Sequence, residues 1–176
     1  MSILKVARMG HPVLRTRARP LEKNEIRSVT VQKLIDDMFE TMREYHGVGL
    51  AGPQVHEGLR LFVAVLDAGD DEEGAAEPLA IINPEITVIG ADVVEDWEGC
   101  LSIPEIRGRV PRAREIIVRA MDRKGAHIEL HAHDFHARVI QHETDHLDGV
   151  LFLDRMKSYE SLTFLDEYQR FWTKDR

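Results

Sequence analysis

Apolar positions along the chain first recur at helical spacing between residues 31 and 45. Positions three and four apart in that segment share one face, which consists of Val31, Leu34, Ile35, Met38, Met42 and Tyr45. The spacing predicts a helix that packs this face on the core. Gly47 follows the segment and is expected to end the helix.

The middle of the chain consists of short β-prone runs. Residues 59–66 are almost all apolar, which predicts a strand covered on both faces. Five further runs follow, at 79–82, 86–94, 106–110, 115–121 and 127–133. The turn signals that are expected to separate these runs are Asn83-Pro84, Gly90, Pro104, Pro111 and residues 122–125.

Two more helices are predicted in the last third of the chain. Asp134 suits the N-cap of a helix over 135–147, and Gly149 can end it. A last helix over about 158–172 carries an apolar stripe that is expected to pack on the core, made of Leu162, Leu165, Tyr168, Phe171 and Trp172. The order of elements predicts an α+β fold. We expect short, mostly antiparallel strands around the central helix, with one helix before and one after them.

Length and composition narrow the class of protein. The chain has 176 residues, of which 43% are hydrophobic and 31% charged, and this predicts one globular domain over residues 1–176. No apolar run approaches the roughly 18 residues of a membrane span, and the first eight residues lack the apolar core of a secretory signal. Cys100 is the only cysteine, which fits a reducing compartment. We therefore expect a cytoplasmic protein with no membrane partner.

The net charge of −8 opposes general binding to phosphate backbones, so no stable nucleic-acid partner is expected. A basic stretch at 107–124 is expected to follow solvated strand edges. The acidic segment 67–78 is expected to form a surface loop, with cation binding as the weaker interpretation.

The sharpest chemical signal is the segment Gln141-His142-Glu143-Thr144-Asp145-His146. Residues four apart in a helix share a face, so His142 and His146 can bind one metal ion. Glu143 lies one step round the helix and can reach a water molecule without being a ligand. Val139 faces the same side and could line an apolar pocket.

A catalytic metal site usually needs a third protein ligand and an open position for water. The extension found in one class of zinc proteases would require a histidine where Phe152 stands, so it is excluded. The remaining candidates are Glu160 and Glu167, the surface-type histidines His131, His133 and His136, and Cys100. Cys100 lies in Glu98-Gly99-Cys100-Leu101-Ser102-Ile103-Pro104, where the glycine lets the backbone approach closely.

A third segment is Gly47-Val48-Gly49-Leu50-Ala51-Gly52-Pro53-Gln54. Residues 47–52 match a dinucleotide-binding pattern, but the segment follows a helix instead of a strand, and Pro53 stands where a helix should continue. We interpret the segment as flexible backbone close to a ligand, with Gln54 as a polar group at its end.

Together, these three segments resemble the peptide deformylase family, whose motifs have the forms GxGLAAxQ, EGCLS and QHExDHLxG. The motifs occur in that order at 47–54, 98–102 and 141–149, and similarity extends to 9–14 and 151–156. The resemblance therefore covers nearly the whole chain. Gly52 departs from the family's usual alanine, and His136 and Arg138 replace apolar residues that some members carry.

The resemblance implies a metal-dependent hydrolase that removes the formyl group from N-formylmethionine at the start of newly made polypeptides. The implied metal ligands are Cys100, His142 and His146. Glu143 would be the general base, and the Gln54 side chain with the Leu101 backbone N–H would stabilise the oxyanion. The implied substrate-binding residues are Val48, Gly49, Glu98, Gly99 and Val139. Glu98 is also expected to pair with Arg112.

The resemblance further implies one divalent metal ion per chain, Fe²⁺ in the cell, although the donor set also suits Zn²⁺, Ni²⁺ or Co²⁺. The implied partners are formyl-methionyl nascent polypeptides, with transient ribosome contact left open, and a monomer is expected. Two alternatives remain at this point. One is an HExxH zinc endopeptidase that uses Glu167 as third ligand, and the other is a non-catalytic, metal-stabilised binding module.

Overall fold

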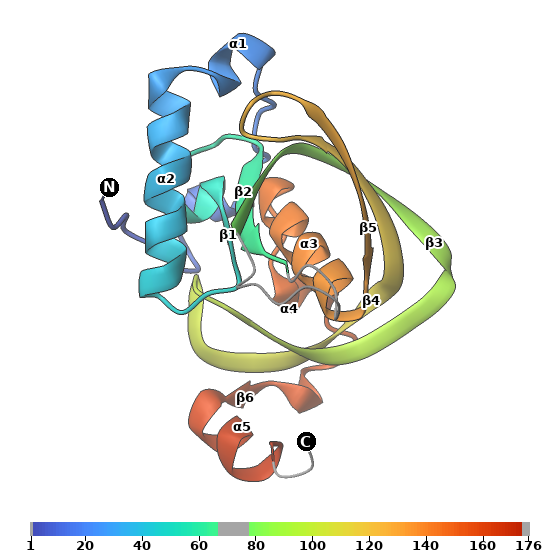
Figure 1. Cartoon of the computed structure of the whole chain (residues 1–176). Coiled ribbons are helices and arrows are strands. Elements are labelled where there is room, and N and C mark those ends of the chain that lie inside the picture. Colours follow the sequence, from blue (N-terminus) through green and yellow to red (C-terminus); the bar gives the residue numbers. More distant parts are fainter. Residues whose placement is uncertain (1, 67–77, 174–176) are drawn as a thin grey trace, which may run out of the picture.

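A computed structural model of the chain describes residues 2–66 and 78–173 (Figure 1). Except for Pro78, the acidic segment that we expected to form a surface loop lies outside the described residues. Helices and one antiparallel sheet are mixed along the chain, in agreement with the predicted α+β class. Among the described residues, no helix has the length and hydropathy that a membrane crossing requires.

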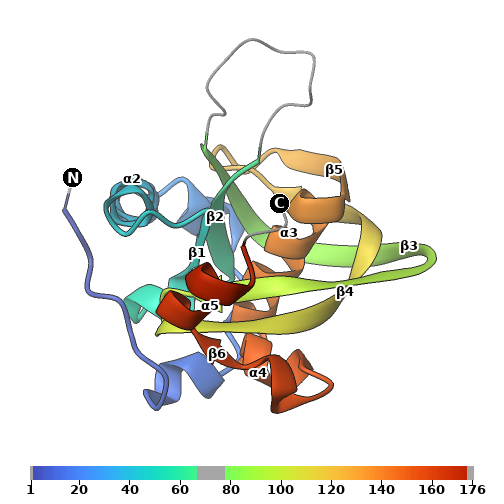
Figure 2. The same ribbon diagram turned by 90° about the horizontal axis from the view of Figure 1, so that it is seen from below.

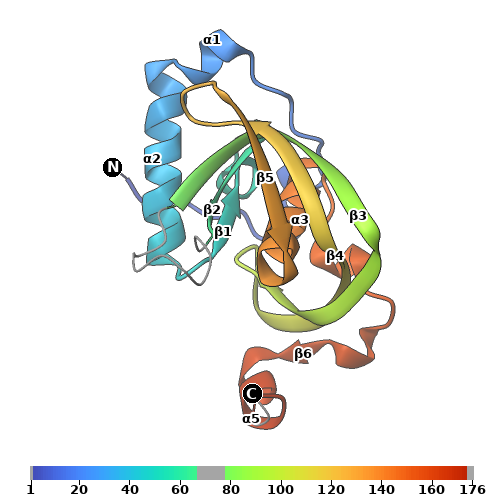
Figure 3. The ribbon, with the colours of Figure 1, turned by 45° about the vertical axis from the view of Figure 1, so that its right-hand side comes forward.

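The sheet has six strands in the order β1-β2-β3-β4-β5, with β6 added to β4. Their bounds are Gly49–Ala51 (β1), Leu61–Val65 (β2), Pro78–Cys100 (β3), Ile103–Met121 (β4), His127–His133 (β5) and Thr163–Phe164 (β6). All the pairings are antiparallel. The β3–β4 ribbon curves around the helix that follows β5 (Figures 1 and 3).

The separate strands expected at 79–82 and 86–94 form one strand, β3, and those at 106–110 and 115–121 form β4. Asn83 and Gly90 do adopt positive φ, of 52° and 69°. They lie at or beside shifts of register between β3 and β4, so these turn signals produce irregularities within a continuous ladder. The turn expected at 122–125 does form, between β4 and β5, with Asp122 N–H donating to the Ala126 carbonyl.

The helices are Lys23–Ile26 (α1), Val29–Glu44 (α2), Asp134–Leu147 (α3), Phe152–Arg155 (α4) and Leu165–Phe171 (α5), with 3-10 turns at Pro12–Arg15, Gly52–Val55 and Tyr159–Ser161. The sequence predicted that Gly47 ends α2, but the residue with the helix-ending conformation is His46, one position earlier. His46 takes the left-handed conformation, with φ of 54°. His46 N–H donates to the Arg43 carbonyl and Gly47 N–H to the Met42 carbonyl, which is the pattern of a Schellman motif.

Helix α3 begins at Asp134, with His133 at the N-cap position and no side-chain capping bond, so the predicted cap is wrong. The Asp134 carboxylate instead pairs with Arg114 on β4. Gly149 follows the end of α3 with φ of 75°, as the sequence predicted. A Cβ atom there would lie 2.9 Å from the Arg15 carbonyl, so the position also requires a small residue.

The helix predicted over 158–172 is split into a 3-10 turn, the short strand β6 and α5. Thr163 and Phe164 pair with Arg107 and Ile106 of β4, which interrupts the helix. None of the residues of α5 is buried, so the prediction that its apolar stripe packs on the core is wrong. Phe171 and Trp172 are 59% and 54% exposed.

The core lies on both sides of the inner strands, with α2 and α3 on opposite sides of β1 and β2 (Figures 1 and 2). Phe62 and Ala64 of β2 belong to the cluster that includes α3, whereas Leu61 and Val63 belong to the cluster that includes α2. Alternate side chains of β2 therefore enter two separate cores, which confirms that this strand is covered on both faces.

Candidate active site

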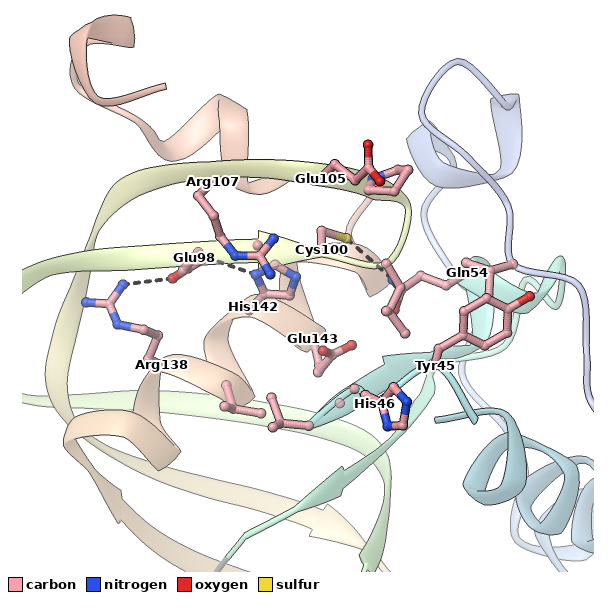
Figure 4. A pocket seen from close by; sticks show the side chains of 18 of the residues that line it. Tyr45, His46, Gln54, Glu98, Cys100, Glu105, Arg107, Arg138, His142 and Glu143 are labelled. Atoms are coloured by element: carbon pink, nitrogen blue, oxygen red, sulfur yellow. Dashed lines mark hydrogen bonds and ion pairs between the residues drawn. The ribbon is translucent and has the colours of Figure 1, made fainter. Parts of the chain in front are cut away.

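The three sequence segments meet at one cleft. The first segment contributes β1 and the turn after it, the second the end of β3, and the third helix α3 (Figure 4). The cleft has a volume of about 590 Å³ and is lined by residues of all three segments. Since these residues lie far apart in sequence, the fold alone brings them together.

Cys100, His142 and His146 form one cluster whose nitrogen and sulfur atoms lie within 4.8 Å of one another. The Cys100 Sγ atom is 3.2 Å from His146 Nε2. Burial opposes ionisation of the thiol, but the charge of His146 and hydrogen bonds with both histidines outweigh it and hold the pKa of Cys100 well below its usual value. A buried thiolate beside two imidazoles is a donor set that fits a divalent transition metal.

Glu98 connects this cluster to two buried arginines. Its carboxylate accepts hydrogen bonds from Arg112 Nε at 2.9 Å and Nη2 at 3.0 Å, and from Arg138 Nη1 at 2.8 Å. His142 Nδ1 lies 2.8 Å from Glu98 Oε2 (Figure 4). Burial alone would raise the pKa of Glu98, but hydrogen bonds from His142 and Arg112 outweigh burial and lower it. Because Nδ1 faces Glu98, the orientation of the His142 ring is set.

The pairing of Glu98 with Arg112 agrees with the sequence hypothesis. Arg112 departs, however, from the expectation that the basic stretch is solvated, because it is only 5% exposed and also bonds Asp145. Sequence analysis missed Asp145, Arg138 and Arg155 as parts of this network, in which Arg155 Nη2 donates to Asp145 at 2.7 Å. The available signals were that Asp145 lies inside the third motif, that Arg155 lies in the similar segment 151–156, and that Arg138 replaces an apolar residue of some family members.

Glu143 is buried, and its Oε2 atom has no hydrogen-bond partner among the described residues. Burial raises the pKa of Glu143 to about 7, although the charges of His142 and His146 oppose this effect. A carboxyl group of that kind can both accept and release a proton near neutral pH. Gly49 makes room for it, because a Cβ atom at that position would lie 2.4 Å from Glu143 Oε1.

The Gln54 side chain is held in one orientation. Its Oε1 atom accepts the Ala51 N–H at 2.8 Å, which leaves Nε2 directed at Ser102 Oγ, 3.2 Å away, and at Cys100 Sγ, 3.5 Å away. The amide donor therefore points into the cleft beside the Cys/His/His cluster.

The other sequence-predicted site residues also line the cleft, namely Val48, Gly49, Gly99, Leu101 and Val139. Val48 is 47% exposed at the rim, whereas Val139 is buried. The alternative third ligands do not join the cluster. Within the described residues Glu160, Glu167, His131 and His133 are exposed, and the one candidate metal cluster contains none of them.

Comparison with known proteins identifies the family of this chain. The model of the polypeptide deformylase family matches residues 3–161. The chain belongs to the polypeptide deformylase family. It is 43% identical over 175 residues to peptide deformylase 2 of Nostoc sp., which covers 98% of this chain and 97% of the relative. It is 44% identical over 163 residues to a peptide deformylase of Salinibacter ruber, which covers 89% of this chain and 82% of the relative.

Solved peptide deformylases have the same fold. A class I type b peptide deformylase from Acinetobacter baumannii superposes with a TM-score of 0.82 at 36% identity, covering 89% of this chain and all of that one (100%). The peptide deformylase from Thermotoga maritima superposes with a TM-score of 0.80 at 40% identity, and the match covers 90% of this chain and 100% of that one. This protein is thus a hydrolase of the deformylase family, which removes the N-formyl group from newly made polypeptides. The endopeptidase alternative is not favoured.

Proposed function

We propose that residues 1–176 form a single catalytic domain organised around α3, and that Cys100, His142, His146 and Glu143 carry out the deformylation. The observation that carries this proposal is the meeting of the three donor side chains within 4.8 Å at the cleft, beside a buried carboxylate with an oxygen that has no partner among the described residues. A binding module would not need such a carboxylate, because burying it without a partner costs free energy.

Cys100, His142 and His146 would hold one divalent cation. When bound, the cation supplies a Lewis acid that lowers the pKa of water and polarises a carbonyl. Thiolate and imidazole donors suit Fe²⁺, Zn²⁺, Ni²⁺ and Co²⁺, and we propose Fe²⁺ in the cell. Both a thiolate and ferrous iron are sensitive to oxygen, so the protein should be prepared under oxygen-free conditions.

Glu143 would accept a proton from the attacking water molecule as the water oxygen bonds to the formyl carbon. The formyl oxygen, which then carries the negative charge, would accept hydrogen bonds from Gln54 Nε2 and the Leu101 backbone N–H. Each donor is expected to stabilise the transition state by about 3 kcal/mol. Glu143 would return the proton to the amine nitrogen as the C–N bond breaks, which releases formate and a peptide with a free N-terminus.

The free edges at the cleft suit an extended peptide. Among the described residues, β1 pairs only with β2, and residues 98–100 of β3 pair only with β4. A formyl-methionyl chain could therefore lie along Val48, Gly49 and Gly99 through backbone hydrogen bonds, with its methionine side chain near Val139 and Glu98. We propose a monomer in the cytoplasm, where nascent chains arise, with any ribosome contact transient.

Formate release from formyl-Met-Ala-Ser tests this proposal, with oxygen-free protein loaded with Fe²⁺ or Ni²⁺. We expect turnover in the parent, and a loss of at least about 100-fold in Glu143→Ala with its metal still bound, because the general base is removed. Glu160→Ala removes an exposed glutamate and should behave as the parent. Full turnover by Glu143→Ala would refute the role of this residue. No formate from metal-loaded parent would refute the proposed activity.

A further inference from the structure

The C-terminal helix α5 stands apart from the rest of the molecule. Figures 1 and 3 show β6 and α5 beyond the β3–β4 ribbon, on the side away from α2 and α1. Helix α5 has no buried residue. It is joined to the body through the pairing of β6 with Ile106 and Arg107 of β4 and through a group of aromatic rings.

Those rings connect α5 to the cleft. Trp97 of β3 lines the cleft, and its ring centroid lies 4.9 Å from that of Tyr168 and 5.5 Å from that of Trp172. Both geometries, edge-on at 60° and tilted at 54°, are of the kind in which aromatic pairs attract each other. We call Tyr168 and Trp172 the α5 ring pair.

Trp97 lies on the face of β3 opposite to that of Glu98 and Cys100, because successive side chains in a strand alternate. It is half-buried, whereas those two residues are buried. Trp97 therefore lines an outer part of the cleft, away from the Cys/His/His cluster. On the same face Arg107 lies against Gly99, where a Cβ atom would come within 2.1 Å of its Nη1 atom.

We infer that the α5 ring pair positions Trp97, and that Trp97 contacts the apolar side chains that follow methionine in the peptide. This inference rests on the proposed function, because it concerns the same cleft. The α5 ring pair acts through Trp97 and touches no reacting atom, so its effect falls on peptide affinity and not on the chemical step. Without the ring pair, the half-buried indole can turn away from the cleft.

Kinetics with two substrates test the inference. One is formyl-Met-Leu-Phe, and the other is formyl-methionine amide, which lacks downstream residues. Tyr168→Ala and Trp97→Ala should each raise KM for the tripeptide about three- to tenfold, the size expected from losing an aromatic contact, with kcat unchanged. Their kinetics with the amide should equal those of the parent. Tyr168→Phe keeps the ring and should restore the parent KM.

Phe171→Ala is the matched control, because Phe171 lies on α5, is 59% exposed, and has its ring against Arg170 and not against Trp97. Equal KM changes on both substrates, or no change in Tyr168→Ala, would overturn the inference while the parent's turnover upholds the proposed function. A metal-loaded parent that turns over neither substrate would overturn both.

Fluorescence supplies a second readout that does not depend on turnover. The chain has two tryptophans, so Trp172→Phe leaves Trp97 as the sole one while keeping a ring at position 172. Titration of this variant with the product peptide Met-Leu-Phe should shift the emission of Trp97. Adding Tyr168→Ala should raise the Kd obtained from that titration about three- to tenfold. An unchanged spectrum at saturating peptide would overturn the contact.

Discussion

At the scale of single residues, Gly52 shows how closely the loop that carries Gln54 is packed. The family commonly has alanine at this position, and the sequence indicated flexible backbone in this segment. In the structure Gly52 is buried, and a Cβ atom would lie 2.8 Å from the Leu59 carbonyl oxygen and 3.0 Å from that of Glu57. The glycine therefore allows two backbone segments to approach each other and to hold the Gln54 amide in place.

We predict that Gly52→Ala, although it introduces the residue common in the family, lowers the free energy of unfolding by about 1–3 kcal/mol, because the backbone must shift to admit the methyl group. Urea unfolding measures this change. Gly58→Ala is the control, because a Cβ atom at position 58 meets nothing within 4 Å. Equal stability of the two variants would contradict the close packing.

At the scale of elements, α2 holds the start of the chain through side chains on its buried face. The Ser2 N–H donates to Asp37 Oδ1 at 2.7 Å, and the Leu4 N–H donates to Thr41 Oγ1 at 2.8 Å. Lys33, one turn before Asp37, pairs with the same carboxylate. The hydrogen bond from Lys33 lowers the pKa of Asp37 below its ordinary value, against the opposing effect of burial.

The Lys33–Asp37 pair makes the stability of the fold depend on pH, and the direction of that dependence follows from the lowered pKa of Asp37. Because the folded-state pKa of Asp37 is lowered, the unfolded chain binds more protons at acid pH. The Asp37 carboxylate contributes fully to stability above about pH 4, which is its pKa in the unfolded chain. This stabilisation is lost as the pH falls through the lower pKa that Asp37 has in the folded protein. We predict that Asp37→Asn is about 1 kcal/mol less stable than the parent at pH 7 and that this difference shrinks below pH 4.

Urea unfolding of parent and variant between pH 3 and pH 7 measures the difference at each pH. Asp36→Asn is the control, because the Asp36 carboxylate is 43% exposed and pairs with Arg123 at the surface. A difference between Asp37→Asn and the parent that is constant down to pH 3 would contradict the role of the Asp37 charge.

At the scale of the whole molecule, buried ion pairs join the elements that form the cleft. Arg138 of α3 donates to Glu98 of β3 and to the backbone carbonyls of Val94 and Val110. Arg112 of β4 donates hydrogen bonds both to Glu98 and to Asp145 of α3. Arg155 of α4 also donates to Asp145. Every charge in this network has a partner, so removal of one arginine takes hydrogen-bond donors away from buried oxygens.

We predict that Arg138→Leu lowers the free energy of unfolding by about 3 kcal/mol, the lower end of the cost of breaking a buried pair, because Arg112 still holds Glu98. The variant should also bind Ni²⁺ about tenfold more weakly in a chelator competition, since Glu98 orients His142. Arg114→Leu removes an arginine whose side chain is 55% exposed and should change neither quantity measurably. Parent-like values for Arg138→Leu would contradict the network.

The sequence by itself predicted those parts of the protein that depend on local patterns. Helical spacing located α2, and the start and stop signals at Asp134 and Gly149 located the helix that carries His142 and His146. The β-prone runs located β2 and β5 within two residues. Motif spacing identified the segments that line the cleft, and Glu98 pairs with Arg112 as expected. These features follow from residues that are neighbours in the chain or from whole motifs.

Only the tertiary structure decided features that depend on distant partners. Asn83 and Gly90 are turn residues, yet pairing with β4 keeps β3 continuous through them. Pairing of Thr163 and Phe164 with β4 split the last predicted helix and left its apolar stripe outside the buried core. Arg112 belongs to a stretch that the sequence predicts to be solvated, but acidic partners from other elements make its burial favourable. A local pattern states what a segment prefers, and long-range pairing and burial decide which preference is realised.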